Sequence, residues 1–212
     1  MAFHLIDLEH WDRKEFYLHF INEVVCSYSV HVDLDISPLK GHKLYPAMLW
    51  LLTDTVNDFE EFRTHLSPEG VGIFDRMTPS YTVFNPDHHN FSVIWTEFCP
   101  DYPEFLERYR EDGEKYRFSR RFAPKEGKPD NTFDVSMIPW LTFSAFHIQV
   151  HGSGTYLLPI FTMGKTFERD GRTLLPLSIQ VHHAVCDGYH VSRFTDTLQQ
   201  KVFCFPAPRE NR

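Results

Sequence analysis

Reactive side chains are most concentrated near the C-terminal end of this 212-residue chain, in residues 180–190 (QVHHAVCDGYH). Three histidines, one cysteine and one aspartate fall within residues 182–190. An unperturbed histidine titrates close to neutral pH, so it can remove a proton from a hydroxyl and later return one. Asp187 follows His183 by four residues and supplies a nearby carboxylate. The pattern is therefore compatible with general base catalysis by one histidine.

Two other interpretations of this cluster stay open on the residues alone. The first is a metal site, whose ligands would be His182, His183, Cys186 and His190. Zinc sites usually draw ligands from paired spacings or from a second segment, and the pair His88-His89 has no matching cysteine or carboxylate pattern. The second interpretation is structural: one histidine caps the following helix and the others are half-buried, which suits His182 and His190.

The cluster follows an apolar run at 174–181 and precedes an amphipathic run at 189–202, so it should lie at a strand-to-helix junction. Hydrophobic periodicity predicts helices at 13–22, 44–59, 101–116 and 189–202. It predicts strands at 27–36, 70–75, 81–84, 91–96, 142–150, 156–167 and 172–182. The dipeptide Asp170-Gly171 favours a tight hairpin turn between the last two strands. Strands and helices that do not strictly alternate indicate an α+β or mixed-sheet α/β fold, with helices over one face of the sheet.

Composition limits the classes of function. The net charge of −8 and the absence of a basic run argue against nucleic-acid binding. With 42% hydrophobic residues, the chain can bury one sizeable core, and we expect one domain over 1–212 with a short polar tail at about 206–212. The 20 phenylalanines suit a packed core, and some could line an apolar pocket.

The sequence also indicates where in the cell the protein resides. No apolar run reaches transmembrane length, and the N-terminus lacks the basic-then-apolar pattern of a signal peptide. We therefore expect a cytoplasmic protein without a membrane partner. The four cysteines are widely spaced, which in a reducing compartment favours free thiols over disulfides.

The cluster at 180–190 also resembles the active-site signature of chloramphenicol acetyltransferases. Five further segments resemble motifs of that family in the same order and at similar spacings. They are residues 11–15 (WDRKE), 43–46 (KLYP), 81–84 (YTVF), 136–140 (SMIPW) and 161–165 (FTMGK). The resemblance covers nearly the whole chain and implies the chloramphenicol acetyltransferase fold, a two-layer mixed-sheet sandwich with helices.

This resemblance implies an O-acetyltransferase that uses acetyl-coenzyme A as co-substrate, needs no metal and confers antibiotic resistance. His183 would take the proton of the acceptor hydroxyl. Ser136 would donate to the oxyanion of the tetrahedral intermediate, and Thr162 would hold an ordered water nearby. Asp187 would pair with Arg13 and shape the site without orienting the imidazole directly.

The resemblance further implies a homotrimer with an active site at each subunit interface. The acceptor pocket would be lined by Phe20, Val24, Tyr28, Thr82, Phe91, Val93, Phe122, Phe146, Ile148 and Val150. Coenzyme A would contact Lys43, Tyr45, Trp140 and Lys165. Phe20 stands where many relatives have tyrosine. That departure leaves open an acyltransferase with another hydroxylated acceptor, and a third hypothesis is a non-catalytic binder of apolar ligands.

Overall fold

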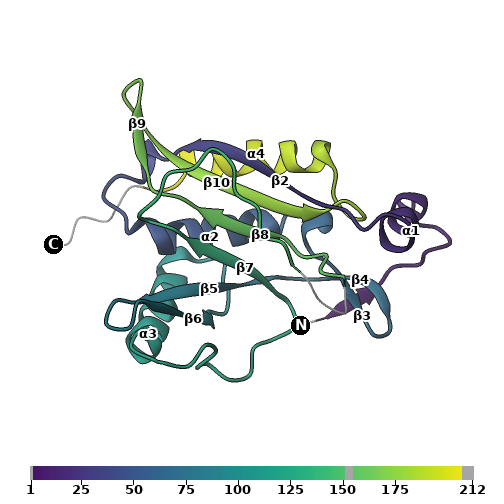
Figure 1. The fold of residues 1–212 in the computed structure, drawn as a ribbon, viewed down its shortest axis with the longest axis horizontal. Coiled ribbons are helices and arrows are strands. Elements are labelled where there is room, and N and C mark those ends of the chain that lie inside the picture. The colour runs from purple at the N-terminus through teal and green to yellow at the C-terminus, as the bar shows by residue number, and fades with distance from the viewer. Residues whose placement is uncertain (1, 151–154, 207–212) are drawn as a thin grey trace.

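The computed structural model describes residues 2–150 and 155–206, and two β-sheets with helices form its frame (Figure 1). The strands are β1 (Phe3–Leu5), β2 (Ser27–Asp35), β3 (Thr64–Ser67), β4 (Gly70–Phe74), β5 (Thr78–Asn85), β6 (Asn90–Trp95), β7 (Thr132–Met137), β8 (Ile160–Met163), β9 (Phe167–Arg169) and β10 (Arg172–His182). The α-helices are α1 (Lys14–Asn22), α2 (Leu44–Val56), α3 (Tyr102–Tyr116) and α4 (Gly188–Phe203), and the short 3-10 helices are η1 (Ser37–Leu39) and η2 (Glu60–Phe62).

The larger sheet is mixed. Its strands run in the order β2-β10-β8-β7-β5-β6, and β9 pairs with β10. The β7–β8 and β5–β7 pairs are parallel and the others are antiparallel. The smaller sheet has the order β1-β4-β3. The predicted mixed-sheet fold is therefore confirmed.

Three helices cover one face of the larger sheet. Helix α2 packs against both α3 and α4 and reaches β5, while α4 contacts β2 and α3 contacts β6. In Figure 1 α2 and α4 lie behind the strands, and α1 stands apart at one end. Helix α2 is apolar nearly all round, with Met48, Leu49, Leu51 and Leu52 fully buried, as expected of a helix enclosed by sheet and neighbouring helices.

The hairpin turn occurs where the dipeptide predicts it. Asp170 and Gly171 have φ of 52° and 75°, the left-handed values that type I′ turns require at both central positions. The turn joins β9 to β10. Strand β10 runs from there to His182 and delivers His183 at its far end.

The predicted strand at 142–150 is wrong, because this segment is irregular in the structure. Its neighbour β10 already pairs with β2 on one side and β8 on the other, so no main-chain ladder is free there. Side chains of β10 satisfy the segment instead. The Ser178 hydroxyl donates to the Phe146 carbonyl at 2.6 Å, and the Gln180 amide oxygen accepts from the Ile148 N–H at 2.9 Å.

Other differences concern boundaries. The expected strand at 156–167 is divided into β8 and the start of β9, and β1, β3 and β7 were not predicted. Within the described residues, no helix is long and apolar enough to cross a membrane. The polar tail expected at 206–212 lies outside the described residues from 207 onward, and the single domain stays a prediction.

Candidate active site

His183 lies in a short loop, residues 183–187, between β10 and α4. Its N–H donates to the Cys26 carbonyl at 2.9 Å, which ties the loop to the chain entering β2. Asp187 is the N-cap of α4, and its carboxylate accepts from the Tyr189 N–H at 3.1 Å. A side chain that satisfies a free N–H group at a helix start is the usual stabiliser of that end. The loop is therefore held at both ends.

Arg13, at the start of α1, holds the loop from the other side. Its guanidinium donates to the His183 and Ala184 carbonyls and to the Asp187 carboxylate, each at 3.0 Å. The Arg13 side chain is only 14% exposed. The predicted Arg13–Asp187 pair therefore exists. Within the described residues the Asp187 carboxylate contacts Arg13, His190 and the backbone, and it makes no hydrogen bond to the His183 ring.

The electrostatics of Asp187 follow from this arrangement. Burial opposes ionisation of the carboxyl group, but the hydrogen bond from Arg13 and the charge of its guanidinium outweigh it. The pKa of Asp187 is consequently lowered from its ordinary value of 3.8. Asp187 is ionised at neutral pH and the pair carries opposite charges.

The His183 ring is placed by two aromatic side chains. Phe20 stacks on its face with centroids 4.3 Å apart, and Tyr28 meets it edge-on at 5.3 Å. Nδ1 of His183 is buried and has no hydrogen-bond partner among residues 2–150 and 155–206. Since Nδ1 is buried, Nε2 is the ring nitrogen that an external hydroxyl can reach.

The other members of the cluster have structural places. His182 is 2% exposed, and its Nδ1 accepts from the Ala184 N–H at 3.1 Å. Burial, together with the neighbouring His183, lowers the pKa of His182. Burial likewise raises the pKa of the Cys186 thiol well above its usual range, which keeps it protonated at neutral pH. Within the described residues, no group of three or more His, Cys, Asp or Glu side chains is arranged to hold a metal ion.

A pocket of about 890 Å³ opens at β5, β6 and β7, and we call it the β5–β7 pocket. Nine of the predicted site residues line it: Tyr45, Thr82, Phe91, Val93, Phe122, Ser136, Trp140, Ile148 and Val150. Ser136 Oγ lies 3.0 Å from Thr162 Oγ1, and Thr162 is 2% exposed on the adjacent strand β8. The predicted oxyanion serine therefore faces the pocket with its threonine directly behind it.

Hydrogen bonds fix the walls of this pocket. The Tyr45 hydroxyl, from α2, donates to the Thr82 carbonyl at 3.0 Å. The Val93 N–H donates to the Phe122 carbonyl at 2.7 Å, which attaches the loop after α3 to β6. Beyond Phe122, the Lys125 ammonium donates to the Asp112 carboxylate of α3 at 2.6 Å, and this largely buried ion pair holds the same loop.

The structure also places residues at the pocket that the sequence interpretation missed. Asp134 and Lys128 line it, 3.5 Å apart, and the Tyr156 hydroxyl donates to Asp134 at 2.9 Å. The period-2 alternation of β7 could have revealed Asp134, because residues 134 and 136 of a strand point to the same face.

Four predicted contact residues lie elsewhere. Phe146 lines a shallow pocket with Tyr28, and Val24 is half exposed after α1. Lys43 and Lys165 are exposed, Lys43 just before α2 and Lys165 just after β8. The Lys165 N–H donates to the Leu141 carbonyl at 2.9 Å, so its backbone is held near the pocket rim that Trp140 forms.

Within one chain, His183 and its aromatic neighbours lie well apart from Ser136 and the β5–β7 pocket. Strand register puts Ser136, Thr162 and Ser178 in one row across β7, β8 and β10. His183 comes five residues after Ser178 in the chain. At about 3.3 Å per residue and about 4.8 Å per strand, it lies roughly 16 Å along the sheet and roughly 10 Å across it from Ser136. His183, Phe20 and Tyr28 therefore form one half of the candidate site, and the β5–β7 pocket forms the other.

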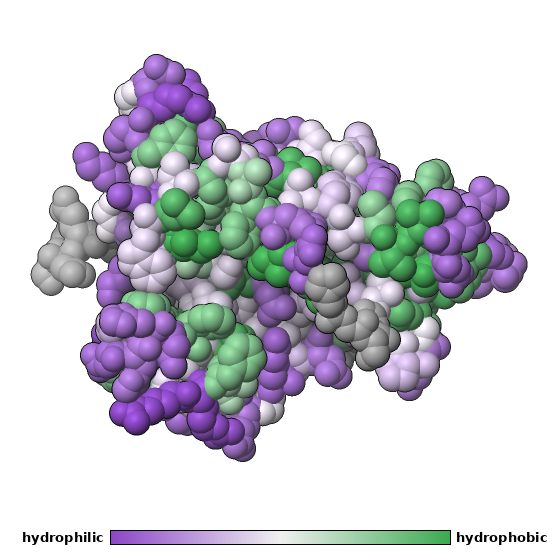
Figure 2. All heavy atoms as spheres, in the orientation of Figure 1, coloured by the Kyte–Doolittle hydropathy of each residue, from purple (hydrophilic) through white to green (hydrophobic). Residues whose placement is uncertain are grey.

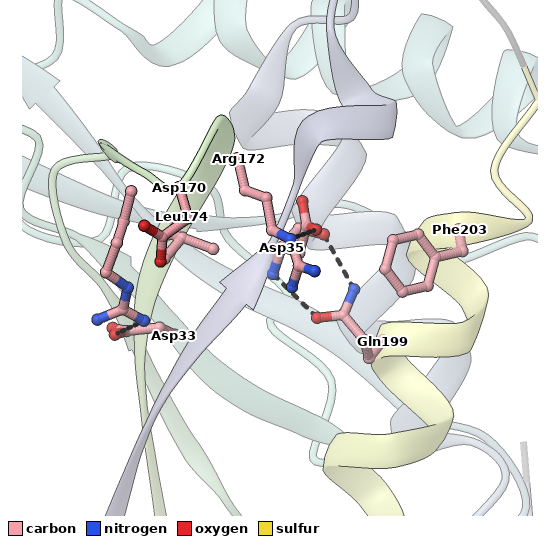
Figure 3. Close-up of a pocket in the computed structure, with 8 residues that line it drawn as sticks. Asp33, Asp35, Asp170, Arg172, Leu174, Gln199 and Phe203 are labelled. Carbon is pink, nitrogen blue, oxygen red and sulfur yellow. Dashed lines mark hydrogen bonds and ion pairs between the residues drawn. The ribbon is translucent and has the colours of Figure 1, made fainter.

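A further pocket, of about 450 Å³, lies beside the β9–β10 hairpin and α4 (Figure 3). Gln199 holds the backbone of Asp35 through two hydrogen bonds of 2.9 Å, as the dashed lines of Figure 3 show. Arg169 pairs with Asp33 at 3.1 Å, and Arg172 lies 3.7 Å from Asp35. Asp170 adds a third carboxylate to these two pairs, and the pocket contains none of the predicted site residues.

Apolar surface gathers around α1, the helix that carries Phe20. Phe16, Val24 and Val25 are 56%, 50% and 70% exposed. Figure 2 shows hydrophobic atoms at the end of the molecule where Figure 1 places α1. Exposed apolar patches of this kind mark interaction surfaces.

Comparisons with known proteins agree with the fold. A family model for chloramphenicol acetyltransferase matches residues 1–199. A chloramphenicol acetyltransferase of Campylobacter coli is 50% identical over 202 residues, covering 94% of this chain and 98% of the relative. One of Clostridium perfringens is 47% identical over 207 residues, covering 94% of each chain. A solved chloramphenicol acetyltransferase shares the fold with a TM-score of 0.86 at 20% identity, covering 95% of this chain and 100% of that one. The chain therefore belongs to the chloramphenicol acetyltransferase family.

Proposed function

We propose that this protein transfers the acetyl group of acetyl-coenzyme A to a hydroxyl of chloramphenicol, with His183 as general base. The observation that carries the proposal is the placement of the His183 ring. Its face lies on Phe20, its Nδ1 is buried, and its carbonyl is held by Arg13. A base fixed in this way presents Nε2 to an incoming hydroxyl.

The reaction needs one proton transfer in each direction. Nε2 of His183 takes the proton of the acceptor hydroxyl while its oxygen attacks the thioester carbonyl. The Ser136 hydroxyl donates to the oxyanion that develops, and Thr162, 3.0 Å from Ser136, supports that hydroxyl and an ordered water beside it. The intermediate then expels the coenzyme A thiolate, which recovers the proton from His183. The products are the acetyl ester and free coenzyme A.

Two copies of the chain supply one site in this proposal. His183 and Ser136 must both reach the same carbonyl, yet about 16 Å along the sheet and about 10 Å across it separate their backbones in one chain. The half-site of His183, Phe20, Val24 and Tyr28 would therefore face the β5–β7 pocket of a second copy. The apolar surface around α1 supports such contact. We propose a homotrimer, in which three such interfaces close on themselves.

The β5–β7 pocket suits an aromatic acceptor. Phe91, Val93, Phe122, Ile148 and Val150 give it apolar walls, and Phe146 would join them from the copy that supplies His183. Tyr45 and Trp140 would contact coenzyme A at the rim, where the exposed Lys43 and Lys165 would reach its phosphates. We further propose a cytoplasmic location and a role in antibiotic resistance.

A second candidate is transfer to another hydroxylated acceptor. Phe20 favours it, because a phenylalanine in contact with His183 offers the acceptor no hydroxyl to bond. A binder without catalysis is a weaker alternative, since binding alone requires neither the positioned His183 nor Ser136.

Release of free thiol from acetyl-coenzyme A, measured with and without chloramphenicol, tests the proposal. We expect release only with chloramphenicol, at one thiol per acetyl ester formed. Release with other hydroxylated acceptors alone would establish the second candidate. Tight binding of chloramphenicol with no release would establish a binder, and a thiol burst without acceptor would indicate an acetyl-enzyme.

A further inference from the structure

The third histidine of the cluster, His190, connects the active-site loop to a distant part of the fold. It lies in the first turn of α4, and its side chain is 19% exposed. Its Nδ1 accepts from the Asp187 N–H at 3.1 Å and lies 3.0 Å from Asp187 Oδ1. Its Nε2 lies 3.4 Å from a Glu61 carboxylate oxygen. Both ring nitrogens are therefore occupied, and each faces a different element.

Glu61 lies on a rigid support. It belongs to η2, whose next residue, Phe62, is 1% exposed. The Phe62 ring stacks on Phe194 of α4, with centroids 4.3 Å apart and planes 12° from parallel. The Thr64 hydroxyl donates to the Glu60 carbonyl at 2.8 Å and holds the backbone that precedes Glu61. The backbone that carries the Glu61 carboxylate is therefore held in place, and the His190 ring can be attached to it.

A continuous series of contacts leads from this point to the base. Glu61 holds His190, His190 holds Asp187, Asp187 pairs with Arg13, and Arg13 binds the His183 carbonyl. Asp187 has two rotatable bonds, and the Arg13 side chain has four, so neither holds its position by itself. The Asp187 backbone is held by His190, and its carboxylate binds Arg13. Together these two contacts set the direction from which Arg13 binds the loop.

We propose that His190, attached to Glu61, is a positioning residue of the acetyl transfer, acting through Asp187 and Arg13 on the placement of His183. This inference rests on the proposed function. Its role differs from that of an ordinary helix cap, because a cap needs only Nδ1 whereas the attachment to Glu61 needs Nε2. The two nitrogens can be replaced separately.

The variants follow from the shapes of the side chains. Asparagine carries a polar atom where histidine has Nδ1, so His190→Asn keeps the cap and loses Glu61. Glutamine carries an N–H donor where histidine has Nε2, so His190→Gln keeps Glu61 and loses the cap. His190→Ala loses both, and Glu61→Leu removes the carboxylate alone. Glu60→Leu is the matched control, one residue earlier in the same 3-10 helix and exposed.

Displacement of a catalytic group by a substitution outside the reacting atoms can cost up to about 100-fold in rate. We expect His190→Asn and Glu61→Leu to lower kcat about 10-fold or more, with the KM for chloramphenicol and acetyl-coenzyme A changed less than about twofold. Their melting temperatures should stay near that of Glu60→Leu. His190→Gln should lose stability but keep more of kcat than His190→Asn does.

Chemical rescue provides a second measurement. A cavity of about 420 Å³ is lined by Arg13, Glu61 and His190, among others. Imidazole can therefore enter beside the position that His190→Ala vacates. We expect added imidazole to restore kcat in His190→Ala and to leave the unsubstituted protein unchanged. Reactions without enzyme and with His183→Ala correct for direct acetylation of imidazole.

Several outcomes would overturn the inference. They are an unchanged kcat in His190→Asn and Glu61→Leu, a loss confined to KM, or a fall in kcat that only follows a fall in melting temperature. Failure of the proposed function gives a different result, in which the unsubstituted protein releases no thiol with chloramphenicol. In that case the exchange rate of the Arg13 Nε–H with solvent, measured by NMR, still tests the positioning role. It should rise in His190→Asn and Glu61→Leu but not in Glu60→Leu, and equal rates in all three would reject the role.

Discussion

The ring of Phe20 lies flat on the ring of His183, with centroids 4.3 Å apart and planes 7° from parallel. Phe20 comes from α1 and His183 from the loop before α4, so the contact joins segments far apart in sequence. The stack restricts rotation of the imidazole, and an aromatic face also stabilises the positive charge that the ring acquires when it takes a proton. The contact therefore contributes to the position of the proposed base.

Replacing Phe20 by leucine tests this contact. An aromatic pair contributes about 0.5–1.5 kcal/mol beyond area burial, so kcat should fall about 2- to 10-fold. Phe20→Tyr keeps the ring and serves as the control, and its kcat should stay close to that of the unsubstituted protein. Steady-state kinetics of both variants give the comparison, and an equal loss in both would separate the effect from stacking.

Removing the base should abolish turnover. His183→Ala deletes an imidazole that is only half-buried, so the fold and coenzyme A binding should remain nearly intact. Thiol release measures the activity, and calorimetry measures the binding of coenzyme A. Retention of more than a few per cent of the activity would contradict the assignment of His183.

Removing the oxyanion donor should reduce the chemical step. Ser136→Ala should lower kcat by about 10²- to 10³-fold while the KM for the acceptor shifts much less. The matched control is Ser80→Ala, a serine that lines the same pocket on β5. A loss that falls mainly on KM would make Ser136 a binding residue.

The Arg13–Asp187 pair should make stability depend on pH. The pKa of Asp187 is lowered in the folded protein, so the pair stabilises the fold above the ordinary pKa of 3.8 and ceases to do so as pH falls through the lowered folded value. Asp187→Asn keeps a helix-capping side chain and removes the charge. At pH 7 we expect it to reduce the free energy of unfolding by about 1–3 kcal/mol, less than the loss of a fully buried pair.

Denaturant unfolding from pH 7 down to pH 3 checks this expectation. The difference between the two proteins should shrink below about pH 4. The same preparations report on the role of Asp187 in catalysis. A large loss of kcat with an unchanged melting temperature would mean that the carboxylate acts on the placement of His183 more than on the stability of the fold.

Complementation tests the shared site. His183→Ala lacks the base, and Phe91→Arg blocks the β5–β7 pocket, so each protein alone should be inactive. Mixed oligomers, prepared by co-expression or joint refolding, should regain activity where an intact His183 half-site meets an intact pocket. No recovery on mixing, or a monomer mass by equilibrium sedimentation, would reject a site made by two copies.

The sequence predicted elements best where local pattern and final structure agree. Alternation along 27–36 and the apolar run at 172–182 predicted β2 and β10 nearly to the residue, and Asp170-Gly171 predicted the turn that joins β9 to β10. The strand prediction failed at 142–150. The alternation there resembles a strand, but β10 already pairs with β2 on one edge and with β8 on the other. Pairing partners are a property of the whole fold, and no local pattern contains them.

The candidate site also contains some residues that the sequence predicted and others that only the fold brings together. The motif at 180–190 predicted His183, and the family resemblance predicted the Arg13–Asp187 pair that the structure contains. Neither gave the link from His190 to Glu61, because those residues are 129 positions apart in the chain (190 − 61) and only the packing of η2 on α4 joins them. The separation of His183 from Ser136 likewise needs the strand register.

Residues 142–150 are attached to β10 through the side chains of Ser178 and Gln180, whereas β7, β8 and β10 are joined by full main-chain ladders. Local opening of a segment costs less where fewer such bonds must break. Ile148 and Val150 can therefore exchange, shift or be replaced without disturbing the strands that carry Ser136 and Thr162. Selection can broaden or narrow the range of antibiotics that enter while the chemistry of acetyl transfer stays as it is.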